Sequence, residues 1–161
     1  MQNTIQELER ELSRSATLEP LGSPVQTFSQ TGRQVLPRAK VLIVDDEPDI
    51  VTSLTKRLRF AGYDTCSARD GMEATSVAIK MRPDVIVLDI GMPCGDGHTV
   101  ADRIRSNTRT MFAQVNFLTA RVSEVDRQKA MQAGAYGYLT KPFKSDELVQ
   151  MIENALADSS F

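Results

Sequence analysis

Carboxylates follow two apolar runs of this chain, each at the point where the run stops. The run at 41–44 ends in Asp45 and Asp46, and the run at 85–88 ends in Asp89. A carboxylate is costly to bury unless its charge is compensated. In open parallel sheets, sites form beyond the carboxyl ends of the strands. The pattern therefore predicts that these acids share one pocket.

Three acids in one pocket repel one another unless a cation compensates their charge. Oxygen ligands suit a hard divalent cation, and Mg²⁺ commonly combines one or two carboxylates with phosphate oxygens. Taken alone, any one of these acids is better explained by helix capping, as Asp46 would be ahead of a helix that Pro48 begins. Two acidic clusters at two strand ends favour the metal site.

Two further strand ends supply the complementary groups. The run at 115–118 ends at Thr119, and the run at 136–139 is followed by Thr140 and Lys141. A hydroxyl and an ammonium would then face the acids. A metal and a lysine offset charge on transferring oxygens, which is how phosphoryl transfer is mostly catalysed. The set predicts a site that holds a phosphoryl group on a carboxylate.

Alternating strands and helices must position these residues. From Ala39 onward, short apolar runs alternate with helical patterns, which implies an α/β fold with a parallel sheet covered on both faces. Right-handed crossovers leave a few doubly wound orders. The expected strands are 40–44, 63–68, 84–89, 113–119 and 135–139. The expected helices are 48–61, 70–81, 97–106, 122–133 and 145–157.

Particular residues are expected to mark helix boundaries or to lie in the core. Pro48 is expected to begin the first helix, and Asp70 (with Glu73), Ser123 and Ser145 are expected to cap the second, fourth and last helices. The expected terminating glycines are Gly62 and Gly134. Met72, Met81 and Met131 have helical spacing and are expected to fill the core. His98, the only histidine, is expected to be a surface side chain.

Composition excludes several classes of protein. The 161 residues are 41% hydrophobic and 25% charged, as in a soluble chain with one domain, and the net charge of −2 argues against a general nucleic-acid or membrane surface. Cys66 and Cys94 form no CxxC pair, which argues against a disulfide framework or a thiolate zinc site. Without a signal peptide or a membrane span, the expected location is the cytoplasm.

The first 38 residues differ from the rest. Thr4 and Glu7 have the spacing of a capping box, and helical apolar spacing follows for less than two heptads, which predicts a short helix. Residues 19–37 are rich in Pro, Gly, Ser, Thr and Gln, which predicts a disordered linker. The expected organisation is an extension over 1–38 and a domain over 39–158.

Four segments carry a family resemblance over 39–158. They are VLIVDDEPD (41–49), VIVLDIGMPCGDG (85–97), NFLTA (116–120) and GYLTKPF (137–143). In this order and spacing they resemble the receiver domain of bacterial response regulators, the phosphoacceptors of two-component systems and phosphorelays. The resemblance implies a flavodoxin-like sheet of five strands in the order 2-1-3-4-5, with five helices.

The resemblance also implies roles for the site residues. Asp89 matches the phosphoacceptor, whose carboxylate attacks phosphohistidine on a sensor kinase. Asp46 matches the direct Mg²⁺ ligand, Asp45 the acid that holds a metal-bound water, and Gly91 the position whose backbone carbonyl binds the metal. Asp89 is itself a metal ligand in this scheme.

The remaining implied roles concern the phosphoryl oxygens and the output. Thr119 and Lys141 match the residues that contact these oxygens, and the bond from Lys141 to Pro142 is cis in the family. Tyr138 matches the aromatic residue that turns inward on activation. Thr119 and Tyr138 would therefore switch the face made by 122–133, 135–139 and 145–157.

The implied partners are a sensor histidine kinase or phosphotransfer protein and a downstream protein target. Unless the chain is a fragment, no effector domain is expected after residue 161, and the output is expected to be contact with another protein. Direct nucleic-acid binding and membrane binding are not expected, and a weak dimer is left open. The expected chemistry is limited to the domain's own phosphorylation and dephosphorylation, so the protein is not expected to be an enzyme in the usual sense.

Three alternatives differ in chemistry. A flavodoxin-like cofactor binder needs backbone donors after its first strand, but the loop at 45–49 is acidic and would repel a phosphate without a metal. An aspartate-nucleophile phosphatase needs a general acid where this chain has Gly91. A degenerate receiver that acts only as an interaction module is the main alternative, although all the family's phosphorylation residues are present.

Overall fold

The computed structural model describes residues 27–28, 34–35, 38–92, 97–120 and 123–159. The chain divides into two units, Met1–Leu36 and Pro37–Phe161. In the first unit, β1 (Thr27–Phe28) and β2 (Gln34–Val35) pair antiparallel. The prediction of a linker over 19–37 did not include this pairing. The helix predicted from Thr4 lies outside the described residues.

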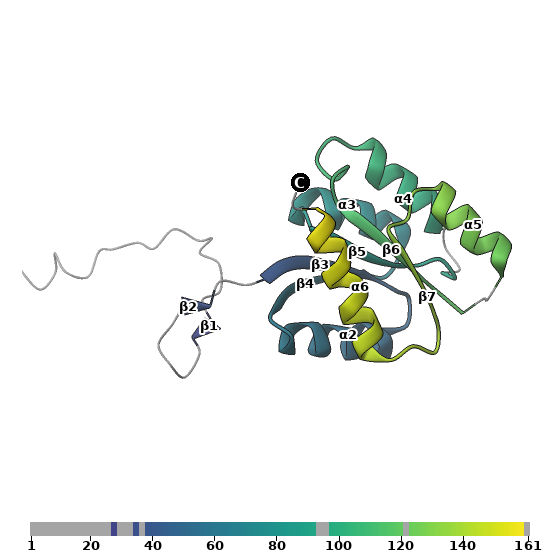
Figure 1. Ribbon diagram of the computed structural model, residues 1–161. Coiled ribbons are helices and arrows are strands. Elements are labelled where there is room, and N and C mark those ends of the chain that lie inside the picture. The colour runs from purple at the N-terminus through teal and green to yellow at the C-terminus, as the bar shows by residue number, and fades with distance from the viewer. Residues whose placement is uncertain (1–26, 29–33, 36–37, 93–96, 121–122, 160–161) are drawn as a thin grey trace, which may run out of the picture. The chain divides into compact units, whose positions relative to one another are not determined.

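The second unit is built on a parallel sheet of five strands (Figure 1). The strands are β3 (Arg38–Val44), β4 (Tyr63–Ala68), β5 (Val85–Asp89), β6 (Gln114–Thr119) and β7 (Gly137–Thr140). Their order in the sheet is β4-β3-β5-β6-β7. Counted within this unit, the order is 2-1-3-4-5, so the predicted topology is confirmed.

Helices cover both faces of the sheet (Figure 1). They are α2 (Pro48–Phe60), α3 (Gly71–Met81), α4 (Gly97–Ser106), α5 (Glu124–Gln132) and α6 (Ser145–Asp158). Buried residues of α2 and α6 form one core layer with the sheet, and those of α3, α4 and α5 form the other. None of the helices in the described ranges is long and apolar enough to cross a membrane.

The central strands supply both core layers. In β5, Val85 and Val87 face the layer under α2 and α6, whereas Ile86 and Leu88 face the opposite layer. All four side chains are fully buried. A strand covered on both faces loses the alternation of apolar and polar residues, which explains the continuous apolar run that precedes Asp89.

Most of the predicted helix boundaries are confirmed. Pro48 is the first residue of α2, and the Asp70 carboxylate accepts hydrogen bonds from Met72 N (2.9 Å) and Glu73 N (2.8 Å). Ser123 Oγ accepts from Asp126 N at 3.4 Å. After α5, Gly134 has a φ of 72°, in the left-handed region where a Cβ would be strained.

The predicted cap of the last helix is wrong by one residue. Ser145 is the first helical residue, and Lys144 occupies the cap position without a side-chain hydrogen bond to the helix. The Glu147 carboxylate accepts instead from Lys144 N at 3.0 Å. The Glu147 carboxylate in the first turn therefore binds the backbone N–H of the cap residue, which has no partner within the helix.

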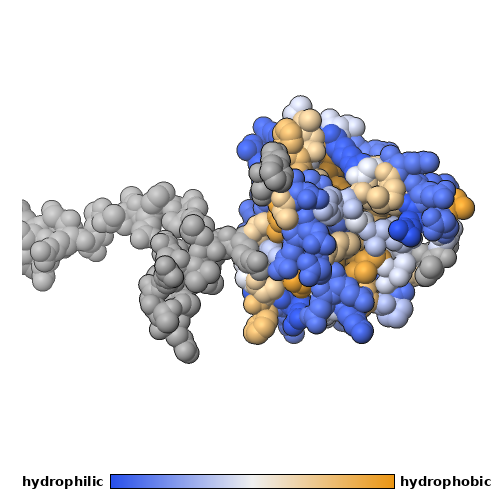
Figure 2. All heavy atoms as spheres, in the orientation of Figure 1, coloured by the Kyte–Doolittle hydropathy of each residue, from blue (hydrophilic) through white to orange (hydrophobic). Residues whose placement is uncertain are grey.

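The prediction that three methionines fill the core is wrong. Met72 is 78% exposed, Met131 is 53% exposed and Met81 is 36% exposed. Smaller residues, Ala74 and Ala78, occupy the buried stripe of α3. On the face of the domain that Figure 2 shows, apolar residues are scattered among hydrophilic ones.

His98 is also placed differently from the prediction. Its imidazole is half-buried, and its ring meets the ring of Phe117 edge-on, with the centroids 5.2 Å apart. The cause lies one residue earlier. A Cβ on Gly97 would lie 2.7 Å from the Cα of Ile90, the residue after β5, so glycine lets the first turn of α4 approach this backbone more closely than any other residue would. His98 is thereby brought against β6.

Candidate phosphoacceptor site

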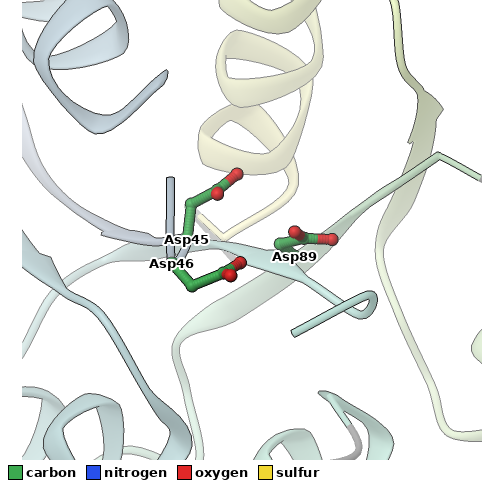
Figure 3. A group of neighbouring side chains, drawn as sticks. All are labelled: Asp45, Asp46 and Asp89. Carbon is green, nitrogen blue, oxygen red and sulfur yellow. The ribbon is translucent and has the colours of Figure 1, made fainter. Parts of the chain in front are cut away.

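The predicted acids converge at the carboxyl edge of the sheet. β3 and β5 are parallel neighbours with Val44 opposite Leu88, so the residues that follow β3 lie beside the last residue of β5. Figure 3 shows the side chains of Asp45, Asp46 and Asp89 beside one another, with the carboxyl groups of Asp45 and Asp46 extending to the side on which Asp89 lies. One oxygen from each lies within 4.8 Å of the others. Asp45 is fully buried, Asp89 is 6% exposed and Asp46 is exposed.

Each buried carboxylate uses one oxygen to hold its own loop. Asp45 Oδ1 accepts from Glu47 N at 2.9 Å, and Asp89 Oδ1 accepts from Gly91 N at 2.8 Å. The other oxygen of each acid faces the ammonium of Lys141. Lys141 Nζ lies 2.7 Å from Asp45 Oδ2 and 3.2 Å from Asp89 Oδ2. One lysine therefore bridges two buried acids that arise from different strands.

This arrangement perturbs the titration of the pair. Burial alone would lower the pKa of Lys141, but hydrogen bonding and charge attraction from Asp45 and Asp89 outweigh burial and raise it. Burial also raises the pKa of Asp45, despite its hydrogen bonds to Lys141 and to the backbone of Glu47. The ammonium thus keeps its charge firmly, and the acids form a region of concentrated negative charge around it.

The acidic cluster is suited to a hard cation. Its donors are carboxylate oxygens from Asp45, Asp46 and Asp89, the ligand type that Mg²⁺ prefers. Asp46 is exposed, so a cation can approach from solvent. The residues present therefore fit a magnesium ion, and Gly91, whose backbone N–H already binds Asp89, lies beside them.

Thr119 and Lys141 come from adjoining strands. Thr119 ends β6 and is 2% exposed, and its carbonyl accepts from Lys141 N at 2.7 Å. The peptide bond from Lys141 to Pro142 is cis, as the resemblance implied. Tyr138 is farther from the acids: it lies on β7 opposite Phe117 and is half-buried. The structure thus brings the acids, Thr119 and Lys141 together. Tyr138 lies on β7, which is separated from β5 and Asp89 by β6.

Two neighbours of the site were not predicted from the sequence. Glu47 Oε1 lies 3.6 Å from Lys141 Nζ and adds an exposed acid to the cluster. His98 lines a hollow of about 460 Å³ that also contains Thr119 and Gly91. Glu47 directly follows the acidic pair and was a visible candidate. For His98, the only signal was its position next to Gly97, whose close approach to Ile90, the residue after β5, a sequence pattern does not reveal.

Comparison with known proteins places the chain in a family. The profile of the response regulator receiver domain matches residues 41–153. The transcriptional regulatory protein PrrA of Mycobacterium tuberculosis is 43% identical over 117 residues, which cover 73% of this chain and 49% of PrrA. The alkaline phosphatase synthesis transcriptional regulatory protein PhoP of Bacillus subtilis is 40% identical over 120 residues, covering 74% and 49%. The chain belongs to the response regulator receiver domain family.

Solved structures agree in fold. The chemotaxis response regulator CheY4 of Vibrio cholerae has 35% identity and a TM-score of 0.68, with 73% of this chain and 98% of that chain covered. The receiver domain of the sensor histidine kinase PA1611 of Pseudomonas aeruginosa PAO1 has 32% identity and a TM-score of 0.68, covering 74% and 98%, and has a magnesium ion coordinated in its active-site cleft. The chain spans about half the length of the curated relatives it matches.

Proposed function

We propose that Asp89 accepts a phosphoryl group from a phosphohistidine of a sensor kinase or phosphotransfer protein. The observation that carries the proposal is the bridge from Lys141 Nζ to Asp45 Oδ2 and Asp89 Oδ2. It places one fixed positive charge beside the carboxylate of Asp89, at a sheet edge where two further acids gather. In the transfer, the P–N bond of phosphohistidine breaks and a P–O bond forms to an oxygen of Asp89.

Several residues around Asp89 would compensate the negative charge of the phosphoryl oxygens. Asp45, Asp46, Asp89 and the Gly91 carbonyl would hold Mg²⁺, which supplies positive charge against the phosphoryl oxygens. Lys141 supplies the second positive charge, and its raised pKa keeps it protonated. Gly91 N keeps Asp89 Oδ1 oriented. These groups are in place before the phosphoryl group arrives, which is the condition for electrostatic preorganisation.

The output is proposed to pass through Thr119 and Tyr138. A phosphoryl group on Asp89 adds about −1.5 to −2 charges and strong acceptor oxygens. The Thr119 hydroxyl would turn to donate to it, and Tyr138 would turn its ring into the space that Thr119 leaves. The face made by α5, β7 and α6 would then change, with a coupling of roughly 1–3 kcal/mol, so a fraction of the unphosphorylated protein already adopts the active form.

This function sets the partners. We propose a histidine kinase or phosphotransfer protein at the acidic edge and a downstream protein at the α5, β7 and α6 face, in the cytoplasm. The domain would catalyse only its own phosphorylation and dephosphorylation. PrrA and PhoP are named transcriptional regulators, so any link to DNA would pass through a segment other than this domain. No observation favours the degenerate alternative.

Labelling of Asp89 tests the phosphoacceptor. Acetyl phosphate with Mg²⁺ should add one phosphoryl group to the wild type, read by intact mass, and Asp89→Asn should abolish the addition because it keeps the shape and removes the nucleophile. Asp102→Asn, which changes an exposed acid of α4, is the matched control and should label normally. If Asp89→Asn labels like the wild type, the assignment is wrong.

A second experiment tests the switch. Beryllofluoride with Mg²⁺ should move amide resonances across 123–157 in the wild type. Thr119→Ala should still be phosphorylated on Asp89 but should lose most of these shifts, because the hydroxyl that senses the phosphoryl group is gone. A full wild-type shift pattern in Thr119→Ala would contradict the proposed coupling.

A further inference from the structure

The hollow behind Thr119 contains an imidazole that the proposed mechanism does not use. This hollow of about 460 Å³ is lined by Gly91, His98, Thr119, Ala120, Asp126 and Lys129. His98 enters it from the first turn of α4, which Gly97 allows to approach the sheet. An imidazole offers a donor and an acceptor on one ring. A polar group that enters this hollow could therefore form a hydrogen bond with His98.

Three residues connect the hollow to Tyr138. Phe117 and Thr119 are two residues apart on β6 and therefore point to the same face of the sheet. Tyr138 is the direct cross-strand partner of Phe117 and packs against the same core layer. His98 contacts Phe117 on that layer, with the ring centroids 5.2 Å apart. The ring of Phe117 therefore has Tyr138 as its cross-strand partner and His98 as its ring contact.

Tyr138 borders a different hollow in this structure. Together with Gly137, Met151 and Asn154, it lines a space of about 650 Å³ between β7 and α6. An inward turn would carry its hydroxyl from this outer space past Phe117 toward Thr119. A buried tyrosine hydroxyl needs a hydrogen-bond partner, because leaving it unsatisfied costs free energy.

The hollow offers few side chains for that hydroxyl. Lys129 is exposed on α5, and Asp126 is half-buried beside the cap of the same helix. His98 is half-buried and is held by the ring of Phe117. Its ring contacts Phe117, the cross-strand partner of Tyr138. Its neutral imidazole accepts from a hydroxyl at one nitrogen and donates at the other.

We propose that His98 binds the hydroxyl of Tyr138 when Tyr138 is turned inward, and so acts as a positioning residue for the activated state. The inference rests on the inward turn in the proposed function and adds to it the side chain that receives the hydroxyl. A group that stabilises the activated state must, by linkage, raise the affinity for whatever selects that state. His98 therefore strengthens the binding of beryllofluoride at Asp89 without touching it.

The test observes Tyr138 directly. The chain has three tyrosines, so ring-labelled tyrosine gives a spectrum in which Tyr63, on β4, serves as the internal reference. Saturating beryllofluoride with Mg²⁺ should shift the Tyr138 ring resonances of the wild type. In His98→Leu, the ratio of inward to outward Tyr138 should fall by about 5- to 150-fold, the range for an unsatisfied buried hydroxyl. The affinity for beryllofluoride should fall in the same direction.

Two further variants separate the hydrogen bond from packing. His98→Gln keeps a donor and an acceptor and should retain most of the Tyr138 shift. In a Tyr138→Phe background, His98→Leu should cause no further loss of beryllofluoride affinity, because the hydroxyl is already absent. Thr99→Val, an exposed change one residue away on α4, should behave as the wild type.

The outcomes distinguish this inference from the proposal beneath it. If Tyr138 does not shift in the wild type, the proposed switch fails and His98 loses its role with it, while labelling of Asp89 is unaffected. If Tyr138 shifts fully in His98→Leu, the hydroxyl binds Asp126 or a backbone carbonyl, and the inference is overturned while the switch stands. Equal losses in His98→Leu with and without the Tyr138 hydroxyl would also overturn it.

Discussion

Replacement of Lys141 by methionine should destabilise the metal-free protein severely. The ammonium bridges Asp45, whose side chain is fully buried, and Asp89, whose side chain is 8% exposed. Methionine keeps most of the length of the side chain and removes its charge. Two buried carboxylates then face each other without a cation. Removing one partner of a buried ion pair typically costs about 3–5 kcal/mol, because the remaining charge is left uncompensated.

An exposed ion pair of the same domain serves as the control for the loss of stability in Lys141→Met. Arg57 of α2 pairs with Asp146 of α6, with side chains 42% and 84% exposed. Exposed pairs contribute about 0–1 kcal/mol, because water screens them. Arg57→Met removes a positive charge and leaves a long apolar stem, as Lys141→Met does. The structure therefore predicts a difference of several kcal/mol between two variants of the same chemical type.

Urea denaturation in the presence of a chelator measures this difference. The chain has no tryptophan, so circular dichroism of the helices is the suitable signal. Domains of this kind unfold with about 5–15 kcal/mol, so Lys141→Met should unfold at a much lower urea concentration than the wild type. If the two variants lose the same small free energy of unfolding, Lys141 does not compensate the buried acids.

Magnesium and pH should each reverse part of the loss. Mg²⁺ at about 100 times its Kd returns about 2.7 kcal/mol to a folded state that alone binds it. In the variant, burial of Asp45 raises its pKa in the folded state without opposition from Lys141. An acid with a raised pKa destabilises the folded state above that pKa, and the loss disappears as pH falls through it. The deficit of Lys141→Met should therefore shrink between neutral and mildly acidic pH, and an unchanged deficit would contradict the assignment of the loss to the carboxylates.

Three other predictions concern single residues. Asp46→Ala should remove most of the Mg²⁺ affinity in an NMR titration while leaving the metal-free fold as stable or more stable, since repulsion among the acids falls; unchanged Mg²⁺ binding would refute its role as a ligand. Asn116→Val should raise the free energy of unfolding by about 1 kcal/mol in urea, because the buried amide of Asn116 has no hydrogen-bond partner among the described residues; a loss of stability would indicate a partner such as a bound water. Burial raises the pKa of the Cys66 thiol from 9.0 to about 11, so in a Cys94→Ser background iodoacetamide at pH 8 should alkylate the folded protein about 100-fold more slowly than the unfolded chain; equal rates would show that the thiol is not buried as described.

The acids of the site could be predicted because strand polarity places them. Parallel strands end at one edge of the sheet, so the residues that follow two apolar runs are brought together whatever the details of packing. Asp45 and Asp89 confirm this expectation, and Lys141 faces both. The helix starts at Pro48 and Asp70 were predictable for a similar reason, since they depend on local backbone chemistry.

Residues whose placement depends on a neighbour's size could not be predicted. Helical spacing assigned Met72 to a core face, but small alanines on α3 fill the space against the sheet, and Met72 is left exposed. His98 was expected to be a surface side chain. Its actual place depends on how closely Gly97 lets α4 approach Ile90. A sequence pattern gives the direction of a side chain but not the depth at which its helix sits.

The position of Lys141 also explains why β7 should carry the response. Lys141 N binds the Thr119 carbonyl, and Thr119 pairs in register with Thr140, so the end of β7 is tied directly to the site. β7 lies at the edge of the sheet, has β6 as its only strand neighbour among the described residues and has four half-buried residues. Its rearrangement disrupts less buried area than that of β5, whose residues are all buried. Local changes occur where the least packing is lost. A rearrangement of β7 is therefore the least costly structural response to charge added at Asp89.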